Sequence, residues 1–243
     1  MSLCIIIPVY NHKDAIGHVV EQLKPFKISC LLINDGSSED CTAVLQQIAK
    51  QHSSWVTLYE RAENGGKGAA VVDGFQLAIK KGFSHAIQID ADGQHKLEDI
   101  AQFVQASEQY PQYLILGQPQ FDASVPKSRL YGRQFTNLWI WINTLSFTIA
   151  DGMCGFRCYP LAATAKLLRS NTVGQGMDFD IDIVVRLYWQ GVDMLNIKTD
   201  VHYPLDGVSH FQLLQDNILI SRIHAQLFFG MLWRIPKLIM RHF

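Results

Sequence analysis

Through its first half, the chain alternates short apolar runs with longer segments in which apolar residues recur at helical spacing. The runs expected to be strands span residues 3–9, 29–33, 55–59, 85–89 and 113–116. The segments expected to be helices span residues 13–24, 39–51, 67–81 and 97–109. Strands that are apolar on both faces and alternate with helices form parallel sheets covered on both sides. We therefore predict an α/β fold with a mostly parallel sheet flanked by helices.

The second half is less regular. Its expected elements are a helix over residues 130–149, a strand over 153–159, an amphipathic helix over 179–190 and a last strand over 192–201. Residues 211–243 are expected to form a helical tail that is broken or bent at Pro236. The 243 residues thus predict one domain, residues 1–210, followed by an amphipathic helical tail, residues 211–243.

The composition argues against several classes of protein. A net charge of −1 gives no basic excess for nucleic-acid binding. Five cysteines without a CxxC pair predict neither a disulfide framework nor a zinc ribbon, and they indicate a reducing, cytoplasmic location. We expect no signal peptide, and no run reaches the roughly 20 apolar residues that a membrane-spanning helix needs.

Polar motifs follow each of the first four expected strands. Asn11 follows the first strand and Asp35 the second, a Gly-rich stretch ending at Lys67 follows the third, and Asp90 follows the fourth. In a parallel sheet with right-handed crossovers, ligands bind outside the carboxyl ends of the strands. We therefore expect these motifs to meet at one edge of the sheet.

The fourth motif has the composition of a metal site. Asp90 and Asp92 stand on alternate residues and could together hold one hard divalent cation that keeps positions open for a diphosphate. Gln94 offers a third oxygen. The same residues would also suit an acidic turn at a strand end. Their place after three other strand-end motifs favours the metal site.

The second and third motifs suit a nucleotide. Asp35 could accept hydrogen bonds from a base, or it could belong to the turn in which Ser37 or Ser38 caps the next helix. The glycines before and after Lys67 would let the backbone approach a ligand, and the lysine would place a cation near phosphate. The spacing is not that of a P-loop.

Four strings together resemble the family 2 glycosyltransferases, which have the GT-A fold. They are IIIPVYN at residues 5–11, NDGS at 34–37, NGGKG at 64–68 and IDADGQH at 89–95. The resemblance implies an inverting transfer of a sugar from a nucleoside diphosphate. The implied nucleotide site consists of Pro8, Tyr10, Asn11, Asp35, Lys67 and Asp90. The implied ligands of Mg²⁺ or Mn²⁺ are Asp90, Asp92 and Gln94.

Within the family, the chain is most similar to polyprenyl-phosphate sugar synthases of the dolichol-phosphate mannose synthase kind. This similarity implies a polyprenyl-phosphate or other lipid-linked acceptor whose phosphate is bound by Arg129 and Arg133. The segment DGMCGFR at 151–157 resembles a segment that borders the acceptor, and the acidic segment 178–182 also matches the family. Residues 203–210 depart from the subgroup because they lack its Arg and Lys. His210 could reach the metal or the diphosphate, but the interpretation as a plain loop histidine is favoured.

The need for a general base depends on the acceptor. A hydroxyl acceptor would need a carboxylate to take its proton, for which Asp151 is the first candidate and Asp180 the second. Asp180 and Asp182 cannot share one helix face, so one could act in catalysis while the other caps the helix. A phosphate acceptor would need no strong base, and the two arginines would orient it.

The predicted helical tail, residues 211–243, bears on where in the cell the protein lies. Residues 218–243 are rich in apolar and aromatic side chains, carry Arg222, Arg234, Lys237 and Arg241, and contain no acidic residue. Such a helix can lie in a membrane interface, which predicts a peripheral protein on the inner face of a membrane. The alternative is a helix packed on the core with its basic residues outside.

Two other functions stay open. A non-catalytic scaffold of the same fold would explain the departure at 203–210, although Asp90 and Asp92 argue against it. A nucleotidyltransferase would normally carry a Gly-rich, basic signature after the first strand, where this chain has VYNH at 9–12. A Rossmann dehydrogenase is disfavoured because no GxGxxG follows that strand.

Overall fold

The structure is a computed structural model that describes residues 1–121, 125, 127–201 and 212–241. Its strands are β1 Leu3–Val9, β2 Ser29–Asn34, β3 Val56–Glu60, β4 His85–Gln88, β5 Leu114–Phe121, β6 Arg157–Pro160 and β7 Met194–Val201. Its α-helices are α1 Lys13–Leu23, α2 Glu39–Gln51, α3 Lys67–Lys80, α4 Ile100–Gln109, α5 Lys127–Thr144, α6 Leu161–Ser170, α7 Phe179–Gln190, α8 Leu213–Leu232 and α9 Ile235–Met240. Two 3-10 turns, η1 Lys24–Phe26 and η2 Leu97–Asp99, extend α1 and precede α4.

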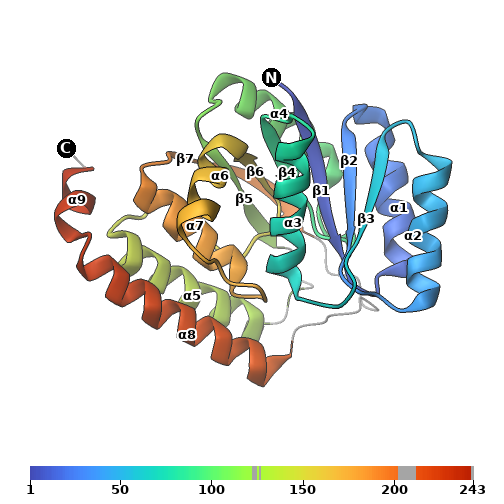
Figure 1. Ribbon diagram of the computed structural model, residues 1–243. Helices are drawn as coiled ribbons and strands as arrows, with labels where there is room; N and C mark the ends of the chain where they lie inside the picture. The colour runs from blue at the N-terminus through green and yellow to red at the C-terminus, as the bar shows by residue number, and fades with distance from the viewer. Residues whose placement is uncertain (122–124, 126, 202–211, 242–243) are drawn as a thin grey trace.

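The strands form one seven-stranded sheet in the order β3-β2-β1-β4-β6-β5-β7 (Figure 1). Every pairing is parallel except those of β6, which runs antiparallel to β4 and β5. Cys4, Ile5, Ile6 and Ile7 of the central strand β1 have no exposed surface. This burial on both faces is what the continuous apolar run predicts. The predicted α/β fold with a mostly parallel sheet is therefore confirmed.

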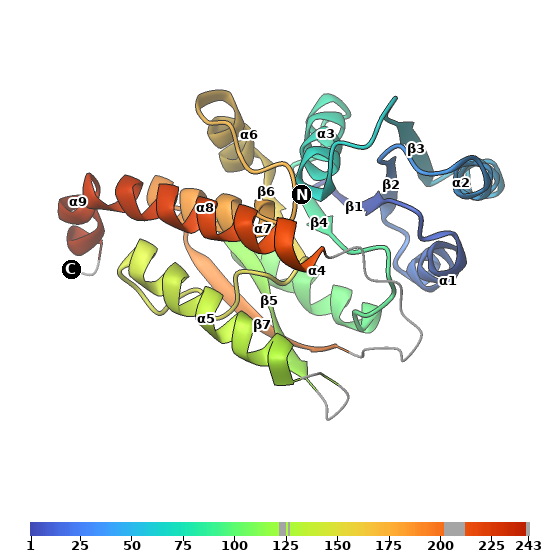
Figure 2. The same ribbon diagram turned by 90° about the horizontal axis from the view of Figure 1, so that it is seen from below.

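Helices cover both faces of the sheet and create two apolar cores (Figure 2). On one face, α3, α6 and α7 pack against side chains such as Ile6, whereas on the other face α1, α2 and α4 pack against Ile5 and Ile7. The alternation within β1 follows from the two-residue period of a strand. Because helices cover both faces, the ends of the central strands are where a ligand could reach them.

The second half differs from the prediction in three places. The strand expected over residues 153–159 is only Arg157–Pro160, and the helix expected over 130–149 is α5, which ends before Leu145 adopts a left-handed φ of 50°. Helix α6 was not predicted at all. By contrast, α2 and α7 begin and end where the sequence places them.

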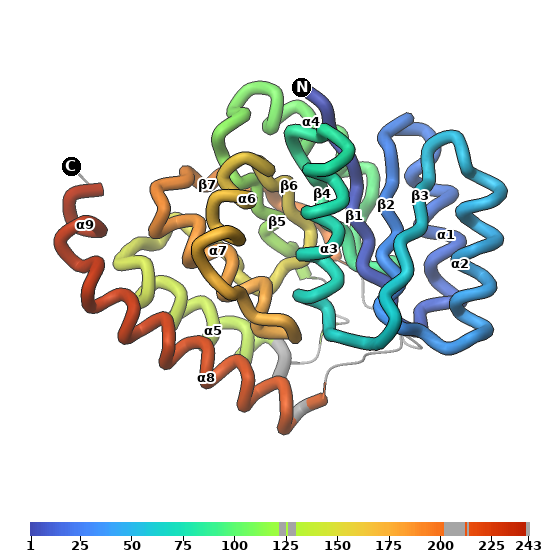
Figure 3. The backbone as a smooth tube through the Cα atoms, in the orientation of Figure 1, coloured from blue at the N-terminus to red at the C-terminus, as the bar shows by residue number. Residues whose placement is uncertain are grey.

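The tail folds onto the domain as two helices with a break before Pro236, which lies in the first turn of α9 (Figure 3). Helix α8 packs along α5 and α7 and buries Ile220, Ile223 and Leu227. Of the tail's cations, Arg222 is exposed, whereas the Arg234 guanidinium lies 4.5 Å from the Trp189 ring centroid. Lys237 and Arg241 likewise donate hydrogen bonds to backbone carbonyls at the end of α7 and beyond it. Among the described residues, no helix combines the length and apolarity that crossing a membrane requires.

Candidate functional site

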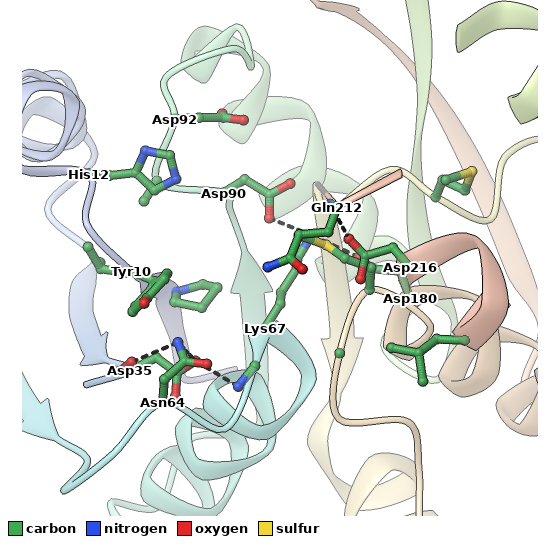
Figure 4. A pocket seen from close by; sticks show the side chains of 18 of the residues that line it. Tyr10, His12, Asp35, Asn64, Lys67, Asp90, Asp92, Asp180, Gln212 and Asp216 are labelled. Atoms are coloured by element: carbon green, nitrogen blue, oxygen red, sulfur yellow. Dashed lines mark hydrogen bonds and ion pairs between the residues drawn. The ribbon is translucent and has the colours of Figure 1, made fainter. Parts of the chain in front are cut away.

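A cleft of about 430 Å³ opens at the carboxyl ends of β1, β2 and β4 (Figure 4). The residues from the strand-end motifs that line it are Pro8, Tyr10, Asp35, Asn64, Gly66, Lys67, Asp90, Asp92 and Gln94. These motifs therefore meet at one edge of the sheet. Asn11 belongs to the same turn but is not among the lining residues, because its side-chain oxygen accepts a hydrogen bond from Ser38 N at 2.8 Å.

Asp35 ties the end of β2 to the Gly-rich loop before α3. Its two carboxylate oxygens each accept a backbone hydrogen bond of 2.9 Å, one from Gly65 N and the other from Gly66 N. Asn64 adds a side-chain hydrogen bond at 3.2 Å. Burial raises the pKa of Asp35, although the bond from Gly65 and the charge of Arg61 oppose the shift. The carboxylate thus holds the loop in place while it faces the cleft.

The glycines of that loop allow a second segment to approach the start of α3. A Cβ at Gly66, whose φ is 92°, would lie 2.6 Å from the carbonyl oxygen of Gln175, and a Cβ at Gly68 would overlap the Gly174 oxygen. Ala69 N donates a 3.1 Å hydrogen bond to the same Gln175 oxygen. The glycines therefore serve close packing between two parts of the chain, in addition to any approach to a ligand.

Lys67 stands between two carboxylates in the middle of the cleft. Its Nζ lies 2.8 Å from Asp90 Oδ1 and 2.8 Å from Asp180 Oδ2. Burial alone would lower the pKa of Lys67, but the charges of Asp180 and then Asp90 outweigh it and hold that pKa above its ordinary range. Lys67 is therefore positively charged, and it forms ion pairs with both aspartates at once.

Asp90 and Asp92 form an acidic pair whose members differ in environment. Burial would raise the pKa of Asp90, but the Lys67 charge and the interaction with His95 outweigh it and keep that pKa below its ordinary range. The pKa of Asp92 is raised, first by burial and then by the negative charge of Asp90. Gln94 N donates a 3.1 Å hydrogen bond to Asp92 Oδ1. The pair is therefore a place where added positive charge would be favourable.

Asp180 extends into the cleft from the first turn of α7, and buried polar groups hydrogen-bond to it on the side facing the core. Gln88 Nε2 donates a 3.2 Å hydrogen bond to Asp180 Oδ1, and Tyr159 OH donates one of 3.2 Å to Gln88 Oε1. The fully buried Arg157 donates to the Asp180 carbonyl oxygen at 2.7 Å and lies 3.8 Å from its carboxylate. This network fixes the direction in which the carboxylate points.

Comparison with known proteins decides the family. The sequence pattern described as Glycosyl transferase family 2 matches residues 4–169, more than half of the chain and all four strand-end motifs. The chain belongs to glycosyl transferase family 2. This family 2 glycosyltransferase is 25% identical to polyprenol monophosphomannose synthase of Mycolicibacterium smegmatis, over 79% of its own length and 74% of that protein. It is 23% identical to undecaprenyl-phosphate mannosyltransferase of Micrococcus luteus, with coverage of 76% and 77%.

Solved structures agree on the fold. The glycosyltransferase superimposes on glucosyl-3-phosphoglycerate synthase of Mycobacterium tuberculosis, solved with Mn²⁺, UDP and phosphoglyceric acid, with a TM-score of 0.67. The two chains are 14% identical, and the superposition covers 95% of this chain and 78% of the other. The predicted GT-A fold is thereby confirmed.

Other predicted site residues of the glycosyltransferase lie outside the residues that line the cleft. Asp151 Oδ1 accepts hydrogen bonds from Arg133 Nη2 at 2.7 Å and from the backbone of Met153 and Cys154, while Oδ2 accepts one from Arg133 Nε. Asp151 and Arg133 thus bind each other. Arg129 lies in the first turn of α5, where side chains are outside the described residues, as is all of His210.

Asp182 faces away from Asp180, as the two-residue spacing on a helix predicts. Its carboxylate pairs with Arg186 and accepts a 2.9 Å hydrogen bond from Gly174 N. Burial raises the pKa of Asp182, against the opposing charge of Arg186. Asp182 therefore anchors the loop that precedes α7.

The sequence did not indicate one wall of the cleft. Residues of the second half that line this wall are Gly176, Met177, Gln212, Gln215, Asp216 and Leu219. Met153, which also lines the cleft, belongs to the segment 151–157 that the family resemblance places beside the acceptor. Those from α8 lie far from the strand-end motifs in the chain, so no local pattern marks them. The acidic Asp216 among glutamines at the start of an apolar helix was the only available signal.

Proposed function

We propose that this glycosyltransferase moves a sugar from a nucleoside diphosphate onto a polyprenyl-phosphate or other lipid-linked acceptor. The observation that carries the proposal is the single cleft in which Tyr10, Asp35, Lys67, Asp90 and Asp180 meet. The named relatives from Mycolicibacterium and Micrococcus support the acceptor class, because both names specify a polyprenyl or undecaprenyl phosphate product or acceptor.

Asp90, Asp92 and Gln94 would hold Mg²⁺ or Mn²⁺. Their donor atoms are all oxygens, which both cations prefer. The described residues contain no group of three or more His, Cys, Asp or Glu side chains that could hold a metal alone. The remaining ligands would then come from the donor diphosphate. When bound, the cation would offset the charge that develops on the leaving nucleoside diphosphate.

Asp180 is the better placed of the two candidate bases. It lines the cleft, whereas Asp151 is occupied by Arg133 and two backbone amides. For a hydroxyl acceptor, Asp180 would accept the proton once Lys67 shifts toward phosphate. For a phosphate acceptor, no strong base is required, and Arg133 with Arg129 would orient the phosphate after Arg133 leaves Asp151. In either case, direct displacement inverts the anomeric carbon.

Access to a lipid acceptor would come from the face formed by α5 and α8. Exposed apolar side chains on it include Tyr131 and Phe135 of α5 and Ile218 and Phe229 of α8. Arg234, Lys237 and Arg241 contact the domain, whereas Arg222 is exposed on α8. The exposed apolar side chains together with Arg222 would therefore supply peripheral binding to the inner membrane surface.

A binding titration tests the donor half of the proposal. Melting temperatures would be measured with UDP, GDP and dTDP, each with and without Mn²⁺, for the wild type, Asp92→Ala and Asp14→Ala. One nucleotide with Mn²⁺ should stabilise the wild type by about 2.7 kcal/mol at a hundred times its Kd. Asp92→Ala should lose this effect, while the exposed Asp14 outside the cleft serves as the matched control.

The responding donor, as its labelled sugar conjugate, would next be incubated with undecaprenyl phosphate, and the label extracted into organic solvent. Label in the lipid supports the acceptor class. A stabilising nucleotide without transfer to this lipid would contradict that class. No response to any of the three nucleotides would instead favour a non-catalytic scaffold.

A further inference from the structure

The first turns of α8 close the cleft on the side opposite the nucleotide motifs. Gln212, Gln215, Asp216 and Leu219 line the same cavity as Tyr10 and Asp35. Figure 4 places Tyr10, Asp35 and Asn64 on one side, Lys67 and Asp90 between, and Gln212 and Asp216 on the other. The cleft thus has two polar ends separated by Asp90 and Lys67.

This wall is held by packing on both sides. Asp216 is buried, and its Oδ2 accepts a 2.7 Å hydrogen bond from Gln212 N, which fixes the turn that begins the helix. One turn further on, a Cβ at Gly176 would come within 3.3 Å of Leu219 Cδ1, so the loop before α7 lies directly against the helix. Ile220 and Ile223 are buried in the core. Gln215 is therefore presented to the cleft by an anchored segment.

The order of the polar groups along the cleft indicates which part of a donor would lie at the end formed by α8. Resting on the proposed function, a nucleoside diphosphate sugar with its base near Tyr10 and Asp35 would set its diphosphate beside Asp90 and Asp92. The sugar is attached to the far phosphate and must therefore extend toward α8. The family match ends at residue 169, before α8 begins, so this wall is outside the part that the family pattern describes.

We propose that Gln215 and Asp216 recognise hydroxyl groups of the donor sugar, so that the start of α8 sets which sugar is accepted. A glutamine amide offers two donors and an acceptor, and a carboxylate accepts strongly, which together match the paired donor and acceptor character of sugar hydroxyls. A site that hydrogen-bonds a substrate hydroxyl discriminates against analogues that misplace it, because its own polar groups are then left unpaired.

The full-length chain and a panel of real ligands test this assignment. Kd values would be measured by calorimetry with Mn²⁺ for UDP, UDP-glucose, UDP-galactose, UDP-N-acetylglucosamine, GDP and GDP-mannose. The compared proteins are the wild type, Gln215→Ala, Asp216→Asn and Gln226→Ala. Gln226 is an exposed glutamine three turns further along the same face of α8 and outside the cleft, which makes it a matched control.

The wild type should bind one sugar conjugate more tightly than its nucleotide alone and more tightly than the other conjugates. Gln215→Ala should reduce that preference about tenfold, the worth of one hydrogen bond, with the Kd of the free nucleotide unchanged. Gln226→Ala should match the wild type. Asp216→Asn, which keeps the acceptor of the Gln212 hydrogen bond, should also reduce the preference.

Three results would overturn the assignment. If both Gln215→Ala and Asp216→Asn keep the sugar preference and bind the nucleotide normally, these residues do not recognise the sugar, while the proposed function is unaffected. Weaker binding of the free nucleotide to Gln215→Ala would place α8 at the wrong end of the ligand. No binding of UDP, GDP or dTDP to the wild type, in calorimetry and in the melting-temperature series together, would remove the proposed function and this assignment together.

Discussion

His224 should make the packing of α8 sensitive to acid. It is 5% exposed and faces α5, where its Nδ1 lies 3.5 Å from Asn143 Nδ2 and its ring lies 6.1 Å from that of Trp139. Its Nε2 has no hydrogen-bond partner among the described residues. Burial lowers the pKa of His224 from its ordinary 6.5 to about 4. The imidazole is therefore neutral at pH 7, and charging it would oppose the folded state.

The magnitude follows from the difference between the two pKa values. The folded state binds the proton more weakly than the unfolded state, so His224 contributes stability that is complete above pH 6.5 and is lost as the pH falls toward 4. A difference of about 2.5 pKa units corresponds to about 3 kcal/mol in total. Between pH 7 and pH 5 the expected loss is about 2 kcal/mol, because most unfolded chains but few folded ones are protonated at pH 5.

The comparison requires a variant that cannot titrate at this position. Free energies of unfolding would be measured by urea titration at pH 7 and pH 5 for the wild type, His224→Leu and His18→Leu. From pH 7 to pH 5, the free energy of unfolding should decline by about 2 kcal/mol less in His224→Leu than in the wild type. His18, exposed on α1, should leave the wild-type decline unchanged. An equal decline in all three proteins would refute the buried, neutral state of His224.

Two further predictions concern the cleft. Lys67→Met leaves the carboxylates of Asp90 and Asp180 without their shared cation, and it should lower the free energy of unfolding, measured in urea, by about 3 kcal/mol. The loss should be smaller for Lys67→Arg. Equal stability of Lys67→Met and wild type would contradict the pairing. Gly155→Ala would drive a Cβ into the Asp90 carboxylate and should abolish the Mn²⁺-dependent nucleotide shift in melting temperature. Gly132→Ala, with nothing within 4 Å, should retain that shift.

The sequence predicted the first half well because its signals are local. The strands β1, β2 and β4 are buried on both faces and are followed by polar motifs, and each helix between them repeats its apolar residues at helical spacing. Continuous burial identifies a parallel sheet, and a parallel sheet places its ligands at the carboxyl ends of its strands. The positions of Asp35, Asp90 and Asp92 in one cleft followed from that rule alone.

The second half was less predictable because its contacts are made at long range. Strand β6 has four residues and runs antiparallel between β4 and β5. It carries the buried Arg157, whose hydrogen bond to the Asp180 carbonyl oxygen on α7 joins residues 23 positions apart in the chain. Helix α6 was different, because the alanines and leucines that follow Pro160 favour a helix by their intrinsic propensity. The part played by α8 in the cleft depends on packing against α5 and α7, and no spacing in the sequence encodes it.

The charge of the cleft links its separate motifs. The whole chain is nearly neutral at −1, but the described residues that line the cleft concentrate negative charge. The ionisable ones, besides Tyr10 and His12, are Lys67 and the carboxylates Asp35, Asp90, Asp92, Asp180 and Asp216. One lysine already shared by two aspartates cannot offset the charge of an incoming diphosphate. The cleft would therefore repel a free nucleoside diphosphate, and only a diphosphate that arrives with divalent cations would find an attractive site. From this acidic lining we expect nucleotide binding to depend on a divalent cation.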